Sequence, residues 1–168
     1  MRERLRAIFD ADLTLLAYHL ALDSHPEVGN NALLCRELAI EPERRFAGIG
    51  FGGPLAEPLS IGSFTRCVAD RLGREPLVFP FGPERIERVA VCSGGAAGHV
   101  AEAAAEGYGC FLTGEADEPT MRSAFELGVH FVAGGHYATE TLGVQALAAA
   151  IAERFGIAWE FVDLPNPV

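Results

Sequence analysis

Residues 89–105 read VAVCSGGAAGHVAEAAA and contain one complete unit of the expected fold. Val89–Cys92 is an apolar run typical of a buried strand, Gly94–Gly98 predicts a tight turn, and Val100–Ala105 predicts a helix. The same alternation continues, with strands expected at Cys110–Thr113, Val129–Val132 and Trp159–Val162, and helices at Thr120–Leu127 and Ala138–Phe155. Strands and helices that alternate across short glycine connections predict an α/β sheet with parallel pairs.

The first half of the chain has a less regular pattern. Helices are expected at residues 2–11, Asn30–Ile40 and Phe64–Gly73, and strands at Leu13–His19 and Leu77–Phe81. Residues 41–62 are rich in glycine and proline, which favours short strands or loops. The run PFGP at residues 80–83 is the best internal boundary, so we expect one domain, 1–168, with lobes at 1–82 and 83–168.

Composition excludes several classes of function. The net charge is −10, and all 13 basic residues are arginine. Duplex DNA binding normally requires clustered basic residues, so no nucleic-acid partner is expected. Without lysine, neither a Schiff base nor a P-loop phosphate contact is available. The four cysteines form no C-x-x-C pair. No 18-residue apolar run or signal-peptide core exists, so we expect a cytoplasmic protein without a membrane partner.

A histidine and a carboxylate stand four residues apart in GGHYATE, residues 134–140, where a strand is expected to end and a helix to begin. On a helix, His136 and Glu140 share one face with Cβ atoms about 5–6 Å apart, so they could ligate one ion or two adjacent ions. The crevice beyond the carboxyl ends of the strands is the usual ligand site in such sheets. The alternative is that His136 caps the helix and Glu140 interacts with its positive end.

A second cluster, YHLALDSHPE at residues 18–27, also follows an expected strand and contains His19, Asp23, His25 and Glu27. Residues of these types are common in hydrogen-bonded turns, so the segment alone favours a turn over a metal site. Metal sites collect ligands from separate segments. Two such clusters at strand ends in one chain therefore favour metal binding.

Three further features leave alternatives open. The turn at residues 92–99 is either a plain tight turn or the floor of an anion pocket, and its Ser93 is a weak nucleophile candidate because the sequence fixes no base beside it. Glu115, which follows the expected strand Cys110–Thr113, either lines the same crevice or is a solvated loop acid. His130 lies inside an expected strand and is more typical of a core histidine than of a ligand.

The combined motifs resemble the Nif-three-like family, whose members carry names such as dinuclear metal centre hexameric protein or GTP cyclohydrolase I type 2 homolog. The motifs are YHLALDSHPEVGNN (18–31), CSGG (92–95), TGE (113–115), GHYATE (135–140) and FVDLPNP (161–167). The resemblance runs from about residue 10 to the C-terminus. It implies a Nif-three-like α/β fold with mixed sheets, two divalent metal ions (zinc, iron or manganese) and a ring-shaped homohexamer.

The resemblance also implies roles for individual residues. Asp23, His136 and Glu140 match metal ligands of the family, and His19 matches a histidine that faces the same site and is expected to transfer protons. The family supplies an adjacent His-His pair upstream of these motifs, whereas only 18 residues precede His19 here. We therefore expect Met1 to be an internal start, in a truncated gene model, a fragment or a degenerate member, and we expect reduced metal affinity.

Three hypotheses of function follow. The first is a metal-dependent hydrolase that acts on a nucleotide or another small phosphorylated metabolite, with Asp23 and Glu140 as hard ligands. The second is a metal-binding or partner-binding oligomeric protein without turnover. The third is a Rossmann-like nucleotide binder that uses residues 92–99, whose nucleotide affinity would survive removal of metal by a chelator.

Overall fold

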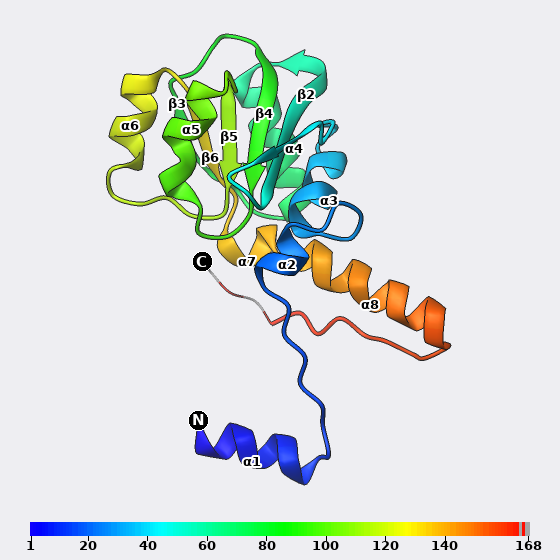
Figure 1. Ribbon diagram of the computed structural model, residues 1–168. Coiled ribbons are helices and arrows are strands. Elements are labelled where there is room, and N and C mark those ends of the chain that lie inside the picture. The colour runs from blue at the N-terminus through cyan, green and yellow to red at the C-terminus, as the bar shows by residue number, and fades with distance from the viewer. Residues whose placement is uncertain (165, 167–168) are drawn as a thin grey trace.

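The computed structural model describes residues 1–164 and 166, and it is built on one six-stranded mixed sheet (Figure 1). The strands are β1 (Arg44–Phe46), β2 (Gly50–Leu59), β3 (Leu77–Pro80), β4 (Ile86–Cys92), β5 (Cys110–Thr113) and β6 (His130–Ala133). Their spatial order is β1-β2-β4-β5-β6-β3. β4, β5 and β6 run parallel, whereas β1, β2 and β3 pair antiparallel with their neighbours. The expected α/β sheet with parallel pairs is confirmed.

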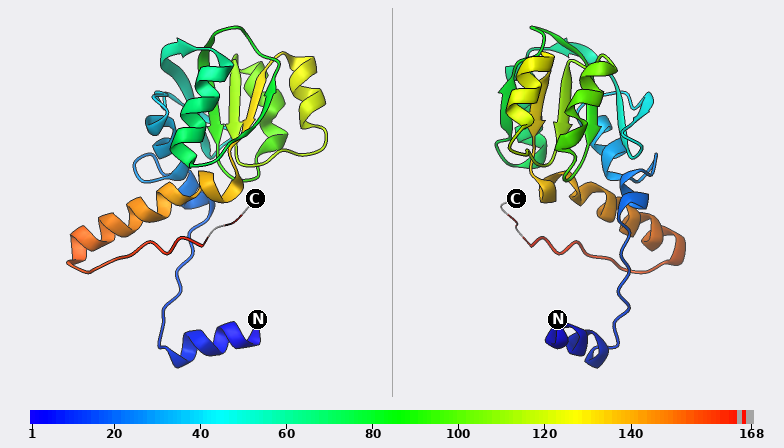
Figure 2. Two further views of the ribbon diagram at one scale, coloured as in Figure 1. Left: turned by 180° about the vertical axis from the view of Figure 1, so that it is seen from behind. Right: turned by 60° about the vertical axis from the view of Figure 1, so that its left-hand side comes forward.

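Helices cover both faces of this sheet. The α-helices of the described residues are α1 (Arg2–Asp10), α2 (Leu20–Asp23), α3 (Asn30–Glu37), α4 (Ile61–Leu72), α5 (Val100–Ala105), α6 (Thr120–Leu127), α7 (His136–Thr139) and α8 (Thr141–Phe155). Helix α1 does not cover the sheet and lies apart from it, at the end of the N-terminal arm (Figure 1). Figure 1 shows α5 and α6 on one face, and the reverse view in Figure 2 shows α4 on the other. Within the described residues, no helix is long and apolar enough to cross a membrane.

The core lies in two layers, one on each side of the sheet. Alternate residues of a strand point to opposite faces, so Val89 and Val91 of β4 pack with α3 and α4, while Ala90 and Cys92 pack with α5. The second layer is rich in aromatic rings, including an edge-to-face contact between Phe111 of β5 and neighbouring Phe131 of β6. Strands β4 and β5 are therefore buried on both faces, which explains their continuous apolar runs.

Two expected strands are absent from the structure. Leu13–His19 is extended but pairs with no strand, and it joins α1 to the body as an arm that leaves Leu13, Leu15 and Leu16 exposed (Figures 1 and 2). Trp159–Val162 also has no strand partner and runs back along α8. An apolar run indicates a segment that can be buried, whereas a strand also requires an open sheet edge beside it.

Other boundaries also differ from expectation. Residues 41–62 contain the ten-residue strand β2, not only short strands or loops. The expected long helix 138–155 begins earlier, as α7 at His136, and is interrupted at Glu140 before α8. Helix α4 begins at Ile61 because the Ser60 hydroxyl accepts a hydrogen bond from the Ser63 amide and so caps it.

His130 is a buried core histidine, as its position in a strand predicted. Its Nδ1 accepts a hydrogen bond from the Gly82 amide at 3.0 Å, and its Nε2 lies 2.8 Å from the Pro83 carbonyl oxygen. These bonds fix the turn between β3 and β4. Burial lowers the pKa of His130, and the hydrogen bond to Pro83 partly offsets that effect. The imidazole is therefore held neutral in the folded protein.

We predict that His130→Ala lowers the free energy of unfolding by about 1–3 kcal/mol, because the Gly82 amide loses its acceptor. The wild-type histidine should also give a pH effect. The pKa of His130 is lower in the folded than in the unfolded chain. Its contribution to the free energy of unfolding is therefore complete above about pH 6.5 and is lost as the pH falls through the folded pKa. Urea denaturation at several pH values measures both effects. His99→Ala, at an exposed site, is the control, and an equal loss in both variants would contradict the prediction.

Candidate metal centre

Three glycine-containing turns stack at the carboxyl ends of the parallel strands β4, β5 and β6. The Gly114 amide donates to the Gly94 carbonyl at 2.9 Å, and the Gly135 amide donates to the Gly114 carbonyl at 2.8 Å. The Gly134 amide donates to the Thr113 carbonyl at 2.8 Å. The sheet register is thus continued by hydrogen bonds from one turn to the next. The residues that follow each of these strands are therefore held at the same edge of the sheet, as expected from the topology.

His136, Glu140 and Glu115 meet at this edge. His136 Nε2 lies 3.5 Å from Glu140 Oε2, and on the other side of the ring Nδ1 contacts Glu115 Oε1. Glu115 thus lines the crevice and is not a solvated loop acid. His136 is not the N-cap residue of α7, and no side-chain capping hydrogen bond forms there. Glu140 stands at the N-cap position of α8, also without a side-chain capping hydrogen bond. With Nδ1 held by Glu115, Nε2 is the ring nitrogen that faces Glu140.

Gly94 provides the space for this contact. A Cβ atom at this position would lie 2.3 Å from Glu140 Oε1 and 3.1 Å from His136 Nε2. Its φ of +66° is also one that residues with side chains rarely adopt. The turn at residues 92–99 is therefore a floor beneath the imidazole and the carboxylate, and only glycine fits there.

Asp23 is brought to the same place by two buried asparagines that the sequence analysis did not single out. Asn30 Nδ2 donates to Asp23 Oδ1 at 2.8 Å, and Asn31 Nδ2 donates to the Asp23 carbonyl at 3.1 Å. The two amide oxygens accept from the Gly143 amide of α8 and from the Ser93 amide, each at 2.6 Å. The pair therefore joins the loop of Asp23 to α8 and to the turn after β4. The only sequence signal was two adjacent asparagines at a helix start.

Asp23 is close enough to Glu140 to influence its ionisation, and both line one cavity. The pKa of Glu140 is raised, first by burial and then by the negative charge of Asp23, while the nearby His136 and His19 act in the opposite direction. Burial also raises the pKa of Cys92 to about 12, with further contributions from Asp23 and Glu140. Cys92 is thus a neutral thiol beside the acidic groups.

The histidines of the N-terminal cluster have different positions. His19 is exposed at the start of α2 and lines a cavity of about 390 Å³ together with Asp23 and Glu140. His25 instead accepts hydrogen bonds at Nδ1 from the amides of Glu27 and Val28, both at 3.2 Å. The structure therefore brings His19 to the site and leaves His25 in the turn.

The donor atoms suit a divalent cation in their chemistry. Carboxylates of Asp23 and Glu140 with an imidazole of His136 are ligands for zinc, iron or manganese. The side chains of Glu140 and His136 pack closely against Gly94, which has no side chain to displace them. Within residues 1–164 and 166, no three His, Cys, Asp or Glu side chains already converge in a metal-binding group. The geometry is thus a contacting pair, His136 and Glu140, with Asp23 nearby, and the ligand assignment stays a prediction.

Comparison with known proteins identifies the family. Residues 1–167 match the family model described as Duf34/NIF3 (NGG1p interacting factor 3). This chain belongs to the Duf34/NIF3 family. A Pseudomonas aeruginosa protein named GTP cyclohydrolase 1 type 2 homolog is 47% identical over 171 residues, which cover 99% of this chain and 68% of that protein. A Deinococcus radiodurans protein of the same name is 43% identical, and the match covers 98% of this chain and 64% of that protein.

Solved structures share the fold of this chain. Protein ybgI, described as of unknown function, superposes with a TM-score of 0.96 at 40% identity, over 99% of this chain and 68% of that one. A second structure, TTHA1606 from Thermus thermophilus, superposes with a TM-score of 0.92 at 34% identity. This match covers 99% of this chain and 67% of that one. The Nif-three-like resemblance and fold class are therefore confirmed. The chain spans about two thirds of the length of these relatives. Residues 165 and 167 of the C-terminal motif lie outside the described part.

We predict that Gly94→Ala lowers the free energy of unfolding by about 1–2 kcal/mol, because alanine is strained at positive φ. Its methyl group should also push Glu140 away from His136. Gly98→Ala is the matched control, because no atom lies within 4 Å of the added Cβ. Urea denaturation measures stability, and the NMR shifts of the His136 ring report the displacement. Equal behaviour of the two variants would show that the contact at Gly94 does not matter.

Proposed function

We propose that this Duf34/NIF3 chain binds divalent metal through Asp23, His136 and Glu140 and belongs to a metal-dependent hydrolase that acts on a nucleotide or another small phosphorylated metabolite. The observation that supports this most directly is the contact of His136 with Glu140 in the field of Asp23. The names of the curated relatives, GTP cyclohydrolase 1 type 2 homolog, support the same reaction class. We include two ions per site, the homohexamer and a cytoplasmic location in the proposal.

Each residue has a chemical task in this proposal. Asp23 and Glu140 offer hard oxygen ligands, and His136 offers Nε2 because Glu115 holds Nδ1. When bound, divalent ions supply Lewis acidity, which polarises a carbonyl or phosphoryl oxygen and acidifies water. His19 lines the same cavity and is exposed, so its imidazole can exchange protons with solvent and with a group bound beside Glu140.

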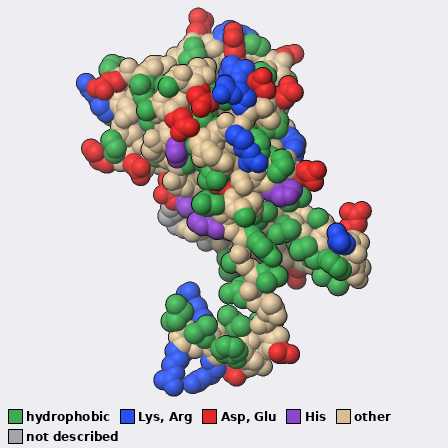
Figure 3. All heavy atoms as spheres, in the orientation of Figure 1, with side chains coloured by type: hydrophobic (Ala, Val, Ile, Leu, Met, Phe, Trp, Pro, Cys, Tyr) green, Lys and Arg blue, Asp and Glu red, His purple; other side chains and the backbone are tan. Residues whose placement is uncertain are grey.

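A second candidate function is a metal-binding or partner-binding oligomeric protein without turnover. Apolar side chains are exposed along the N-terminal arm and α8, among them Leu16, Tyr18 and Val144 (Figure 3). Exposed apolar patches are typical of interaction sites. Both candidates include metal binding, so a metal measurement does not separate them. A turnover assay does.

The metal assignment predicts the effect of removing single ligands. Asp23→Ala and Glu140→Ala should each reduce bound zinc or manganese at least about tenfold. Glu118→Ala, which removes an exposed carboxylate, should not change the metal content. Plasma mass spectrometry on dialysed protein measures this, with the Pseudomonas aeruginosa relative as reference. Full stoichiometric binding by Asp23→Ala would contradict the proposal.

The proton-transfer role predicts a separation of binding from turnover. His19→Gln should leave the metal content unchanged and reduce kcat for GTP hydrolysis by about 10²–10⁴. Wild-type activity should disappear with a chelator and return with zinc or manganese. Metal binding with no turnover of GTP or other nucleotides by wild type would favour the non-catalytic candidate. An unchanged kcat in His19→Gln would contradict the assignment of His19.

A further inference from the structure

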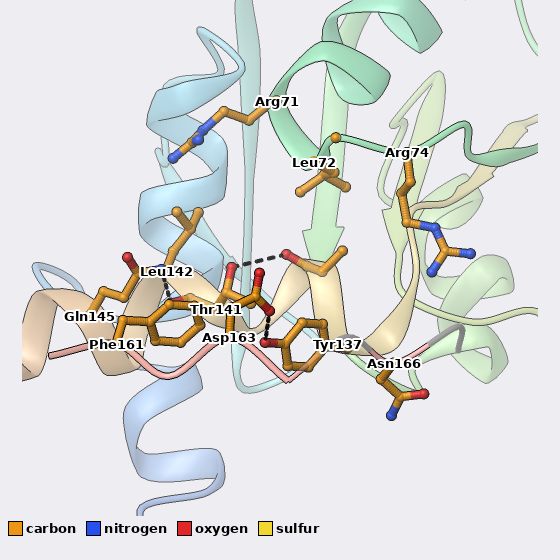
Figure 4. A pocket seen from close by; sticks show the side chains of 12 residues that line it. Arg71, Leu72, Arg74, Tyr137, Thr141, Leu142, Gln145, Phe161, Asp163 and Asn166 are labelled. Carbon is orange, nitrogen blue, oxygen red and sulfur yellow. Dashed lines mark hydrogen bonds between the residues drawn. The ribbon is translucent and has the colours of Figure 1, made fainter.

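Two of the proposed metal ligands stand at the ends of the short helix α7. The helix begins at His136 and ends at Thr139, and Glu140 follows directly. Tyr137 lies on its outer side, where it lines a cavity of about 430 Å³ and donates a hydrogen bond from its hydroxyl to Asp163 (Figure 4). Thr139 is completely buried on the inner side, against the turn after β4. The inner side of α7 is therefore the side that attaches this helix to the sheet.

The Thr139 hydroxyl forms that attachment. Its Oγ1 accepts a hydrogen bond from the Gly94 amide at 3.1 Å, across 45 residues of chain. Its proton lies within reach of the Gly135 and His136 carbonyl oxygens, each 2.9 Å from Oγ1. The hydroxyl thus uses both its donor and its acceptor capacity on the backbone. It connects the floor of the candidate site with the start of the helix that carries His136.

The two backbone groups of Gly94 have different partners. Its carbonyl oxygen accepts hydrogen bonds from the Gly114 amide at 2.9 Å and from the Thr113 hydroxyl at 3.1 Å, so β5 and the turn after it hold this side. Its amide instead donates to Thr139. Removal of the Thr139 hydroxyl would leave a buried amide without this acceptor, while the turn would keep its bonds to β5 and to the turn after it. The lost bond is the one between the turn and α7.

The fit of α7 against Gly94 matters for the proposed ligands because both of them touch this glycine. A Cβ atom on Gly94 would lie 2.3 Å from Glu140 Oε1 and 3.1 Å from His136 Nε2. A shift of α7 relative to the turn would therefore move both donor atoms. Residues that orient metal ligands are typically worth about 10- to 100-fold in metal affinity.

We propose that Thr139 is a positioning residue of the candidate metal centre, whose hydroxyl holds His136 and Glu140 in the arrangement that binds a divalent cation. The binding of the cation rests on the proposed function. The placement of His136 and Glu140 by the bond to Gly94 does not, and it can be measured in the metal-free chain.

Two substitutions separate the hydroxyl of Thr139 from its methyl group. Thr139→Val keeps the branched shape and removes the hydroxyl. Thr139→Ser keeps the hydroxyl and removes the methyl group, which lies 3.3 Å from the place that a Cβ on Gly134 would take. Thr139→Val should weaken the binding of zinc or manganese by about 10- to 100-fold, measured by competition with a chelator. Thr139→Ser should bind these ions as wild type does.

Two other threonines provide matched controls. Thr120 is buried, and its hydroxyl accepts a hydrogen bond from the Asp117 amide at 2.9 Å, far from the site at the start of α6. Thr141 is close to Thr139 in the chain but lines the outer cavity (Figure 4). Thr120→Val and Thr141→Val should not change metal affinity. Thermal unfolding should show a loss of stability in Thr120→Val as well as in Thr139→Val, so lower stability alone would not explain a selective loss of metal.

NMR of the metal-free chain at one pH tests the positioning without metal. The ring signals of His136 are identified by their absence in His136→Gln. They should shift in Thr139→Val, because α7 loses its bond to Gly94, and they should keep their wild-type positions in Thr139→Ser and Thr120→Val.

The results separate failure of the positioning role from failure of the proposed function. Wild-type metal affinity in Thr139→Val, or an equal loss in Thr139→Ser or Thr120→Val, would overturn the positioning role. A wild-type chain that binds neither metal would contradict the proposed function, and the NMR comparison would then decide. A shift of the His136 ring in Thr139→Val alone would support the positioning role, whereas an unchanged ring would overturn it.

Discussion

The buried pair Asn30 and Asn31 holds the two halves of the candidate site together. Their side chains bind Asp23 on one side and the amides of Ser93 and Gly143 on the other, across 62 and 113 residues of chain. A buried amide without a partner costs about 1–3 kcal/mol, whereas a satisfied one fixes position as well as contributing stability. In the short helix that carries Asp23, the buried residues are Leu22 and Asp23 itself. The position of Asp23 beside Glu140 is fixed by the hydrogen bonds from Asn30 and Asn31 as well as by this burial.

A second constraint is the lack of space where the parallel strands end. The turns after β4, β5 and β6 are hydrogen-bonded to one another, so they pass too close together for side chains. A Cβ on Gly114 would lie 2.7 Å from both the Gly94 carbonyl oxygen and His136 Cα. The same glycines that permit this stacking leave room for His136 and Glu140 at Gly94 and for Arg74 at Gly135. Glycine at these positions is therefore required both by the fold and by the candidate site.

The local sequence pattern predicted the features that depend only on residues close together in the chain. The strands and helices from β4 to α6 were predicted because each contains its own periodic apolar pattern, and GGHYATE identified His136 and Glu140 because their spacing is local. The strand β2 was missed because its glycines are required by distant atoms: a Cβ on Gly52 would lie 2.5 Å from the Tyr108 ring. The contact of Glu115 with His136 and the asparagine network join residues far apart in the chain, so they appear only in the folded structure.

The candidate site works against the stability of the fold. Burial and the charge of Asp23 raise the pKa of Glu140, so its ionised form is less favourable in the folded than in the unfolded chain. The sign of that shift means that ionised Glu140 destabilises the protein at neutral pH, and that protonation at lower pH relieves the effect. A chain selected only for stability would replace this carboxylate or separate it from Asp23. Asn30, Asn31 and Gly94 instead hold the two acidic groups near each other, with an imidazole between Glu115 and Glu140. A cation bound as proposed would offset the repulsion between Asp23 and Glu140.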